Sequence, residues 1–257
     1  PVSPLLRGEA LVTVTADDGQ RAPQPASFCV LVYPQAHAVS DGAYHLERWE
    51  ANPPAGSYPP HMLFLQGEED DSSLDTPLEH AYRIPEDDAA DPEDVFHPYD
   101  ASSRTRIHGL GADGFSFINT GRDRDLGGAL LALDTRGTAD VSVGWLAGTV
   151  DPNERVYALR LQYRVGTSGA FRDVTDAFGL PVEYVRHASA GHAQSMEPVP
   201  LPPAAVGQEY VQLLWRYHRL SGDSGPRAEL RLDELLVAGA AQQPATAIAW
   251  LDGPPVG

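Results

Sequence analysis

The 257-residue sequence has no lysine, a single cysteine, and no apolar run approaching the ~18 residues that would cross a bilayer. Cys29 alone cannot form an intrachain disulfide, and a chain of this length buries enough core to fold without one. The missing lysine excludes Schiff-base and P-loop chemistry. Because no apolar run is long enough to cross a bilayer, we expect no membrane insertion. The opening PVSPLLRGEA lacks the charged and apolar regions of a signal peptide, so an export signal was either removed or never present.

The charge balance is strongly acidic. All eighteen basic residues are Arg and they face 36 Asp and Glu, which gives a net charge of −18. A nucleic-acid-binding protein needs a basic face to displace counterions from phosphates, so we expect no nucleic-acid partner. Anionic membranes are disfavoured for the same reason. With 23 Pro, 24 Gly and almost no Cys, the composition fits a secreted surface protein.

Alternating apolar and polar residues dominate the chain, and a period of two is typical of half-buried strands. In the second half the alternating segments are residues 114–119 (GFSFIN), 140–150 (DVSVGWLAGTV), 156–165 (VYALRLQYRV), 209–217 (EYVQLLWRY) and 228–237 (AELRLDELLV). Residues 9–15, 27–33, 43–49 and 61–66 have similar compositions, and Pro, Gly and Asp fill the connections. The sequence predicts an all-β fold, an antiparallel, jelly-roll-like β-sandwich with little helix.

We predict one β-sandwich domain over residues 1–237. It is interrupted at residues 67–100 by a long acidic excursion, in which thirteen residues are Asp or Glu and Arg83 is the only basic one. Residues 238–257 form a C-terminal extension, and its segment 245–251 (ATAIAWL) has the pattern of one more strand. That strand either closes its own sheet or adds to the exposed edge of a neighbouring subunit.

Several strings together carry a family resemblance: RTRIHGLGADGFSFINTG, DLGGALLALDTRG, VSVGWLAGTVDPNERVYALRLQYRVGTSGAFRDV, PVEYVRHASAGHAQS, YVQLLWRYH and GPRAELRLDELLV. They resemble an accessory β-sandwich module of large secreted bacterial proteins, found there beside lamin-tail-like and endonuclease/exonuclease/phosphatase-like domains. The likeness covers residues 44–237. It departs from the module at His108 and His187, which stand where an Asn-like turn residue is expected. The resemblance implies an extracellular or cell-surface location and no established activity.

Calcium is the cofactor that the acidic residues favour, because this hard cation takes six to eight oxygen ligands. Candidate ligands in the acidic excursion are Asp87, Asp88, Asp91 and Asp94, and the alternative is a solvated charged loop. A second candidate pair is Asp233 and Glu234 in the last predicted core strand. The alternative there is a cross-strand ion pair with Arg227 or Arg231.

Exposed Trp rings serve as flat platforms in sugar-binding sandwiches. Trp145 and Trp215 follow strand alternation and are predicted to lie in the core. Trp49 and Trp250 border loops, so they are the candidate ligand-binding residues, with burial in the core as the alternative.

Catalytic signatures are absent from the sequence. The GLGADG turn at residues 109–114 precedes a predicted strand, whereas a phosphate loop precedes a helix. His187 and His192 near Glu183 lack the further ligands of a zinc site, and no GxSxG motif occurs. A carboxylate pair of the glycosidase type stays open, because only geometry identifies one. No catalytic residue is assigned.

These observations favour a secreted, non-catalytic β-sandwich that acts in adhesion or assembly at the cell surface. Its predicted partners are other copies of itself or cell-surface proteins, with self-assembly through the terminal strand. A carbohydrate-binding module with a polysaccharide ligand is the first alternative. A secreted polysaccharide-active or other hydrolase is the second.

Overall fold

A computed structural model describes residues 8–20, 22–51, 58–68, 71–78, 80–81, 107–119 and 124–241 of the chain. The backbone in these ranges is almost entirely extended, and its only helical elements are two 3₁₀ turns, η1 (Val39–Asp41) and η2 (Pro203–Ala205). Neither turn is long or apolar enough to cross a membrane. The prediction of an all-β fold with little helix is confirmed.

One sheet is built around β10 and is called the β10 sheet. In spatial order its strands are β14 (His192–Pro200), β10 (Thr138–Asp151), β16 (Glu229–Ala241), β8 (Phe115–Phe117) and β7 (Ile107–Gly109), and β4 (Tyr44–Leu46) also pairs with β16. Every pairing in it is antiparallel.

The other sheet is built around β15 and is called the β15 sheet. Its order is β12 (Arg172–Asp173), β11 (Val156–Val165), β15 (Val211–Ser221), β9 (Arg124–Asp134), β5 (Met62–Glu68) and β6 (His80–Ala81), with β13 (Glu183–Val185) on β11 and β3 (His37–Ala38) on β9. The β3–β9 pairing is parallel and the others are antiparallel.

The two sheets pack face to face through large aromatic side chains. Trp145 on β10 meets the edge of Trp215 on β15, with ring centroids 5.9 Å apart. Phe117 on β8 stacks on Tyr217 of β15 at the same distance. Each such buried ring stabilises the fold by about 1.5–3 kcal/mol relative to exposure. This inter-sheet core confirms the predicted β-sandwich and the predicted burial of both Trp residues.

Strand β15 is buried on both faces over residues 211–218, although its alternating sequence predicts that one face is exposed to solvent. Trp215 and Tyr217 face the core. The intervening residues, among them Arg216 and His218, lie on the outer face of the sheet, which other segments cover. Residues 71–78, which belong to the predicted acidic excursion, cross this outer face instead of standing away from the sheets.

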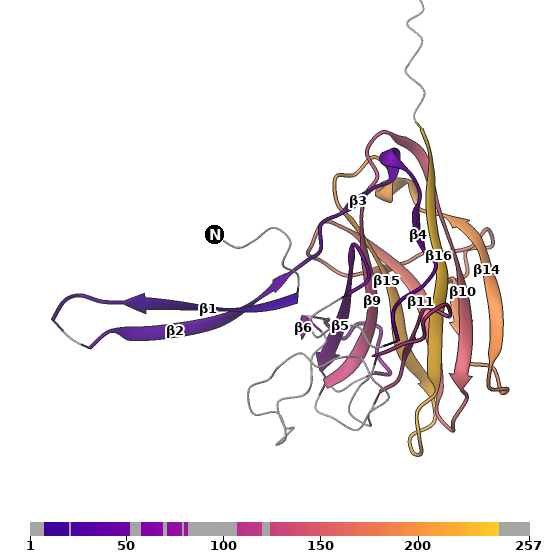
Figure 1. Cartoon of the computed structure of the whole chain (residues 1–257), viewed down its shortest axis with the longest axis horizontal. Helices are drawn as coiled ribbons and strands as arrows, with labels where there is room; N and C mark the ends of the chain where they lie inside the picture. The colour runs from indigo at the N-terminus through magenta and orange to yellow at the C-terminus, as the bar shows by residue number, and fades with distance from the viewer. Residues whose placement is uncertain are drawn as a thin grey trace, which may run out of the picture.

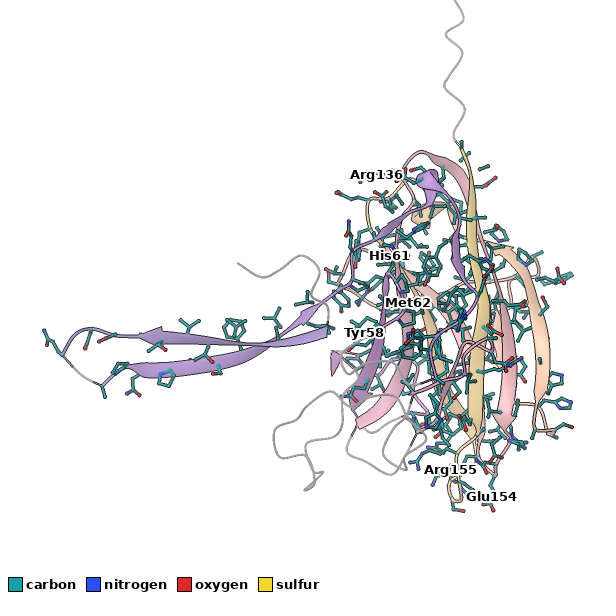
Figure 2. All side chains as sticks on the ribbon, in the orientation of Figure 1. Tyr58, His61, Met62, Arg136, Glu154 and Arg155 are labelled. Atoms are coloured by element: carbon teal, nitrogen blue, oxygen red, sulfur yellow. The ribbon has the colours of Figure 1, made fainter. Side chains whose placement is uncertain are left out.

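A long hairpin leaves the sandwich. Its strands, β1 (Gly8–Ala16) and β2 (Gln24–Val32), pair with each other over nine residues and with no other described strand. The hairpin projects from the side of the sandwich, as Figure 1 shows. At its base the hairpin lies close to Tyr58, which is labelled in Figure 2. A Cβ built on Gly8 would lie 3.5 Å from the hydroxyl of Tyr58.

Candidate functional site

A cavity of about 560 Å³ lies between the base of the hairpin and the outer face of the β15 sheet. Leu31 and Tyr33 line it from the hairpin side, residues 74–78 and 167–171 line its rim, and Arg164 and Arg216 come from the sheet. The cavity therefore combines two guanidinium groups with aromatic, apolar and hydroxyl side chains.

Arg164 is fixed by contacts on every side of its guanidinium. Its Nε donates to Oε1 of Gln212 at 2.6 Å, and its Nη2 donates to the hydroxyl of Tyr33 at 2.8 Å. The guanidinium carbon lies 4.3 Å from the ring centre of Phe171 and 5.4 Å from that of Tyr33. Such cation–π packing holds the planar group between the two rings.

Arg216 is a buried cation, with 4% of its surface exposed. Its Nη2 donates to the carbonyl oxygens of Ser73 at 3.1 Å and Thr76 at 2.7 Å. Burial lowers the pKa of Arg216 to about 10, and the field of Asp75 opposes this shift. None of the described acidic residues forms an ion pair with it, which is uncommon for a buried charge.

Residues 71–78, here called the segment over the cavity, are anchored at both ends. At one end, Asp71 accepts from Arg219 Nε at 3.0 Å, from Asn119 Nδ2 at 3.3 Å and from the hydroxyl of Tyr157. Burial alone would raise the pKa of Asp71, but these hydrogen bonds outweigh it and hold the pKa below its ordinary value. At the other end Leu78 is buried. The cavity wall is therefore tied to the sandwich.

The side chains that line this cavity offer hydrogen-bonding groups and aromatic surface. Arginine donates to carboxylate or hydroxyl oxygens in a fixed, bidentate geometry. Aromatic rings pack with their faces against the apolar face of a sugar ring, and Asp75 and Thr76 supply further polar atoms. None of the described residues that line the cavity is Cys or His.

A second polar cluster pins β13 to the β15 sheet. Oε1 of Glu183 accepts from Arg160 Nε at 2.7 Å and lies 2.8 Å from Nε2 of His218. Burial would raise the pKa of Glu183, but the hydrogen bonds from His218 and Arg160 lower it further than burial raises it. His218 is 3% exposed, whereas the side chains of Arg160 and Glu183 are 18% and 15% exposed.

His187 and His192 form a stacked pair, with ring centroids 4.0 Å apart. Nδ1 of His192 lies 3.0 Å from the hydroxyl of Tyr184, and the backbone N–H of His187 donates to Thr149. Glu183 contacts His218 and Arg160 instead of this pair. Within the described ranges, no three His, Cys, Asp or Glu side chains converge as a metal site would require.

Trp49, a predicted binding platform, is buried instead. It is 8% exposed and packs against Phe64 and Phe115, with ring centroids 5.5 and 5.9 Å away. Its backbone pairs with Gly111 of the GLGADG turn. The ring of Trp49 therefore lies in the core, which is the alternative that the sequence left open.

Asp233 and Glu234 lie at a β-bulge where β16 passes Trp145 on β10. Asp233 is 3% exposed and accepts from the backbone N–H of Glu234 at 2.7 Å, whereas Glu234 is exposed and has a φ of 44°. Burial raises the pKa of Asp233. Arg231, the predicted alternative partner, forms an ion pair with Asp113 at 2.8 Å. Calcium at these two acids stays a prediction.

Other predicted site residues lie outside the described ranges. They are the calcium candidates Asp87, Asp88, Asp91 and Asp94, the platform candidate Trp250, and the terminal strand 245–251. These assignments stay predictions.

The residues that the sequence did not single out are Tyr33, Arg164, Phe171 and Arg216. The sequence shows Arg164 only as a polar position in the alternation of VYALRLQYRV, and Arg216 as a charge that follows the apolar run LLW in EYVQLLWRY. Cross-strand register then sets Arg164 opposite Gln212 on β15, four residues before Arg216. That register cannot be read from either segment alone.

Comparisons with known proteins give remote likenesses only. No family model and no curated protein matches the chain. The K3 cleaved adhesin domain of Lys-gingipain from Porphyromonas gingivalis is 13% identical at a TM-score of 0.34, covering 76% of this chain and 98% of that domain.

Two structures from Clostridium perfringens ZmpB are also similar. CBM51-2 in complex with GlcNAc and INT domains is 12% identical at a TM-score of 0.27, covering 91% of this chain and 38% of that one. The M60 catalytic domain with CBM51-1 and CBM51-2 is 11% identical at a TM-score of 0.25. That match covers 91% of this chain and 18% of the other. Likenesses this distant assign no family and no function. The predicted companionship with lamin-tail-like and endonuclease/exonuclease/phosphatase-like domains stays a prediction.

Proposed function

We propose that this chain is a non-catalytic binding module of an extracellular or cell-surface protein, and that it holds an acidic saccharide in the cavity beside the hairpin. The observation that carries the proposal is the pairing of Arg164 and Arg216 with Tyr33 and Phe171 in one cavity. Its volume, about 560 Å³, lies within the range of ~300–1,000 Å³ typical of small-molecule sites.

The acidic character of the ligand follows from Arg216. A buried cation is costly unless an anion or several hydrogen bonds compensate it, and here two carbonyl oxygens are its described partners. A carboxylate entering the cavity would add the missing opposite charge. The rest of the molecule carries a large negative charge, so specificity for an acidic ligand must come from this local pair of Arg residues.

The saccharide character follows from the remaining lining. Tyr33 and Phe171 are partly exposed and bring aromatic surface to the cavity. Thr167 and Ser168 supply hydroxyl groups at the rim, which hydrogen-bond sugar hydroxyls. Calcium binding and self-assembly through the terminal segment remain separate predictions, independent of this cavity.

The test is calorimetric titration of the purified chain with uronic-acid and sialic-acid oligosaccharides, and with neutral oligosaccharides of equal length. We expect binding of an acidic saccharide and at least about tenfold weaker binding of its neutral counterpart. Arg216→Gln should weaken binding by about tenfold or more. The matched control is Arg136→Gln, which removes an exposed Arg from the β9–β10 turn, outside the cavity (Figure 2).

A second variant avoids any damage to the cavity wall. Asp75 is exposed and lines the cavity, and its field acts on Arg216. Asp75→Asn should therefore tighten the binding of an acidic saccharide by about two- to fivefold at low salt and leave neutral sugars unaffected. If no acidic saccharide binds, or if Asp75→Asn leaves its affinity unchanged, the proposal is wrong.

A further inference from the structure

The projecting hairpin has one entirely apolar face over most of its length. In its register Ala10 lies opposite Val30, Val12 opposite Phe28, and Val14 opposite Ala26. Directly opposed residues point to the same side of a two-stranded sheet. The side chains on this side, here called the hairpin face, are those of Ala10, Val12, Val14, Ala16, Ala26, Phe28, Val30 and Val32, with Gln24 opposite Ala16 at the outer end of the strands.

The hairpin face is exposed to solvent. Phe28 is 52% exposed, Val14 55% and Val30 37%. Figure 2 shows side chains along the outer hairpin standing clear of the sandwich. The opposite side differs, because Thr13 and Ser27 form a hydrogen bond of 2.7 Å there and Leu31 turns toward the cavity. The hairpin face is thus largely apolar and is uncovered by any described residue.

Physical chemistry predicts that such a face is covered in the functional protein. A two-stranded hairpin without further packing is marginally stable in water, and contiguous exposed apolar surface marks an interaction site. The tip is unsuited to a lipid surface, since Asp17 and Asp18 form the turn through hydrogen bonds to Gly19 and Gln20. Their carboxylates would enter the bilayer first.

We infer that the hairpin face packs against the same face of a second copy of this chain. The pattern of small and large side chains is self-complementary about a two-fold axis that runs across the strands at the level of Val12 and Phe28. This operation sets Ala10 against Val14 of the second copy, and Val30 against Ala26. A large side chain then meets a small one on either side of a central Val12 and Phe28 layer, as close-packed sheets require.

The charge distribution also favours a second copy of this chain as the partner of the hairpin face. The protein carries −18, so most contacts between two copies would bring acidic groups together. Residues 10–16 and 24–32 contain no acidic or basic residue, which makes the hairpin face a surface on which two copies meet without like charges. The two-fold arrangement is antiparallel, so it keeps the two sandwiches at opposite ends of the paired hairpins.

The size of the face sets the expected strength. Strands of nine residues, about 30 Å long and about 10 Å across the pair, give a buried area on the order of 600 Å² for two faces. Stable interfaces bury about 1,200–2,000 Å², so this contact alone gives a dimer that dissociates in the micromolar range or above.

The first test is sedimentation velocity of the full chain over a series of concentrations. We expect a reversible monomer–dimer equilibrium. Phe28→Asp places a charge on the two-fold axis from both copies, so it should raise the dissociation constant by about 100-fold. The matched control is Thr15→Asp, which puts the same charge on the opposite side of the hairpin and should leave the dimer intact.

A cross-linking test removes the objection that Phe28→Asp disrupts the hairpin itself. In a Cys29→Ser background, Val12→Cys should be joined efficiently by a short bis-maleimide, because residue 12 faces its own copy across the axis. Thr15→Cys, on the far side, should not be. A chain that stays monomeric at all concentrations, a dimer that survives Phe28→Asp, or equal cross-linking at both positions would overturn the inference. None of these outcomes depends on saccharide binding.

Discussion

Asp71 is a single carboxylate that connects two strands and residues 71–78, the segment over the cavity. Its side chain is 6% exposed and accepts hydrogen bonds from Tyr157 on β11 and Arg219 on β15. Its backbone oxygen also accepts from the N–H of Arg219 at 2.6 Å. Asp71 therefore fixes where residues 71–78 begin, and with them one wall of the cavity.

We predict that Asp71→Ala lowers the free energy of unfolding by about 2–4 kcal/mol, because it leaves buried donors without their acceptor. The control is Asp223→Ala, which removes an exposed carboxylate paired with the same Arg219. It should change the free energy of unfolding by less than about 0.5 kcal/mol. Urea denaturation of both variants measures the difference. Equal effects of the two substitutions would contradict a special role for Asp71.

At the scale of elements, the segment over the cavity is seated on β9 by a close approach. A Cβ on Gly127 would lie 2.1 Å from Cδ2 and 2.9 Å from Cγ of Leu78. The whole Leu78 side chain would have to move, since rotating its methyl groups relieves only part of the clash. Glycine at position 127 is thus required for Leu78 to pack there.

We predict that Gly127→Ala lowers the free energy of unfolding by about 1–3 kcal/mol through overpacking. Leu78→Ala removes the clashing atoms, so in the double variant the cost of Gly127→Ala should largely disappear. A double-mutant cycle by chemical denaturation measures this coupling. Additive effects would show that Gly127 and Leu78 do not limit each other.

The elements recovered from sequence are those in which apolar and polar residues alternate, even where both faces are buried, as in β15. Strand β11 was predicted with its observed bounds, because its alternation continues to the turns on both sides. The pattern missed β9, where the run ALLAL is buried on both faces and so shows no alternation. It also missed β14, an exposed edge strand containing Pro198 and Pro200.

Strands β1 and β2 show a different limit. Both were predicted as strands from their composition, and both are strands. Their alternation reports that one face is apolar, but not which surface covers it. The cavity shows the same limit, since its Arg residues belong to two strands far apart in sequence that only cross-strand register brings together.

At the scale of the whole molecule, three partly buried carboxylates link stability to pH. The pKa values of Asp71, Glu183 and Glu229 all lie below their ordinary values. For Glu229, burial would raise the pKa, but hydrogen bonds from His108 and Ser116 outweigh burial. The folded state thus prefers these three groups ionised more strongly than the unfolded chain does.

A lowered folded-state pKa contributes stability that is complete above the unfolded value, near 4, and is lost as the pH falls through the folded value. Asp233, whose pKa is raised, acts in the opposite direction but is a single group. We therefore predict that the free energy of unfolding falls steeply below about pH 4.5. Urea denaturation at pH 3–7 measures it.

The pH dependence can be traced to one of these carboxylates by substitution. Glu183→Gln removes the acid that joins His218 and Arg160, so it should lower stability at pH 7 and flatten the loss of stability below about pH 4.5. Glu209→Gln is the matched control, because its carboxylate is exposed and lies 3.7 Å from an exposed Arg136. It should leave the profile unchanged. If the slopes of Glu183→Gln and the parent coincide below that pH, the acid sensitivity arises from the general charge of the molecule, because the buried clusters would then contribute nothing measurable to it.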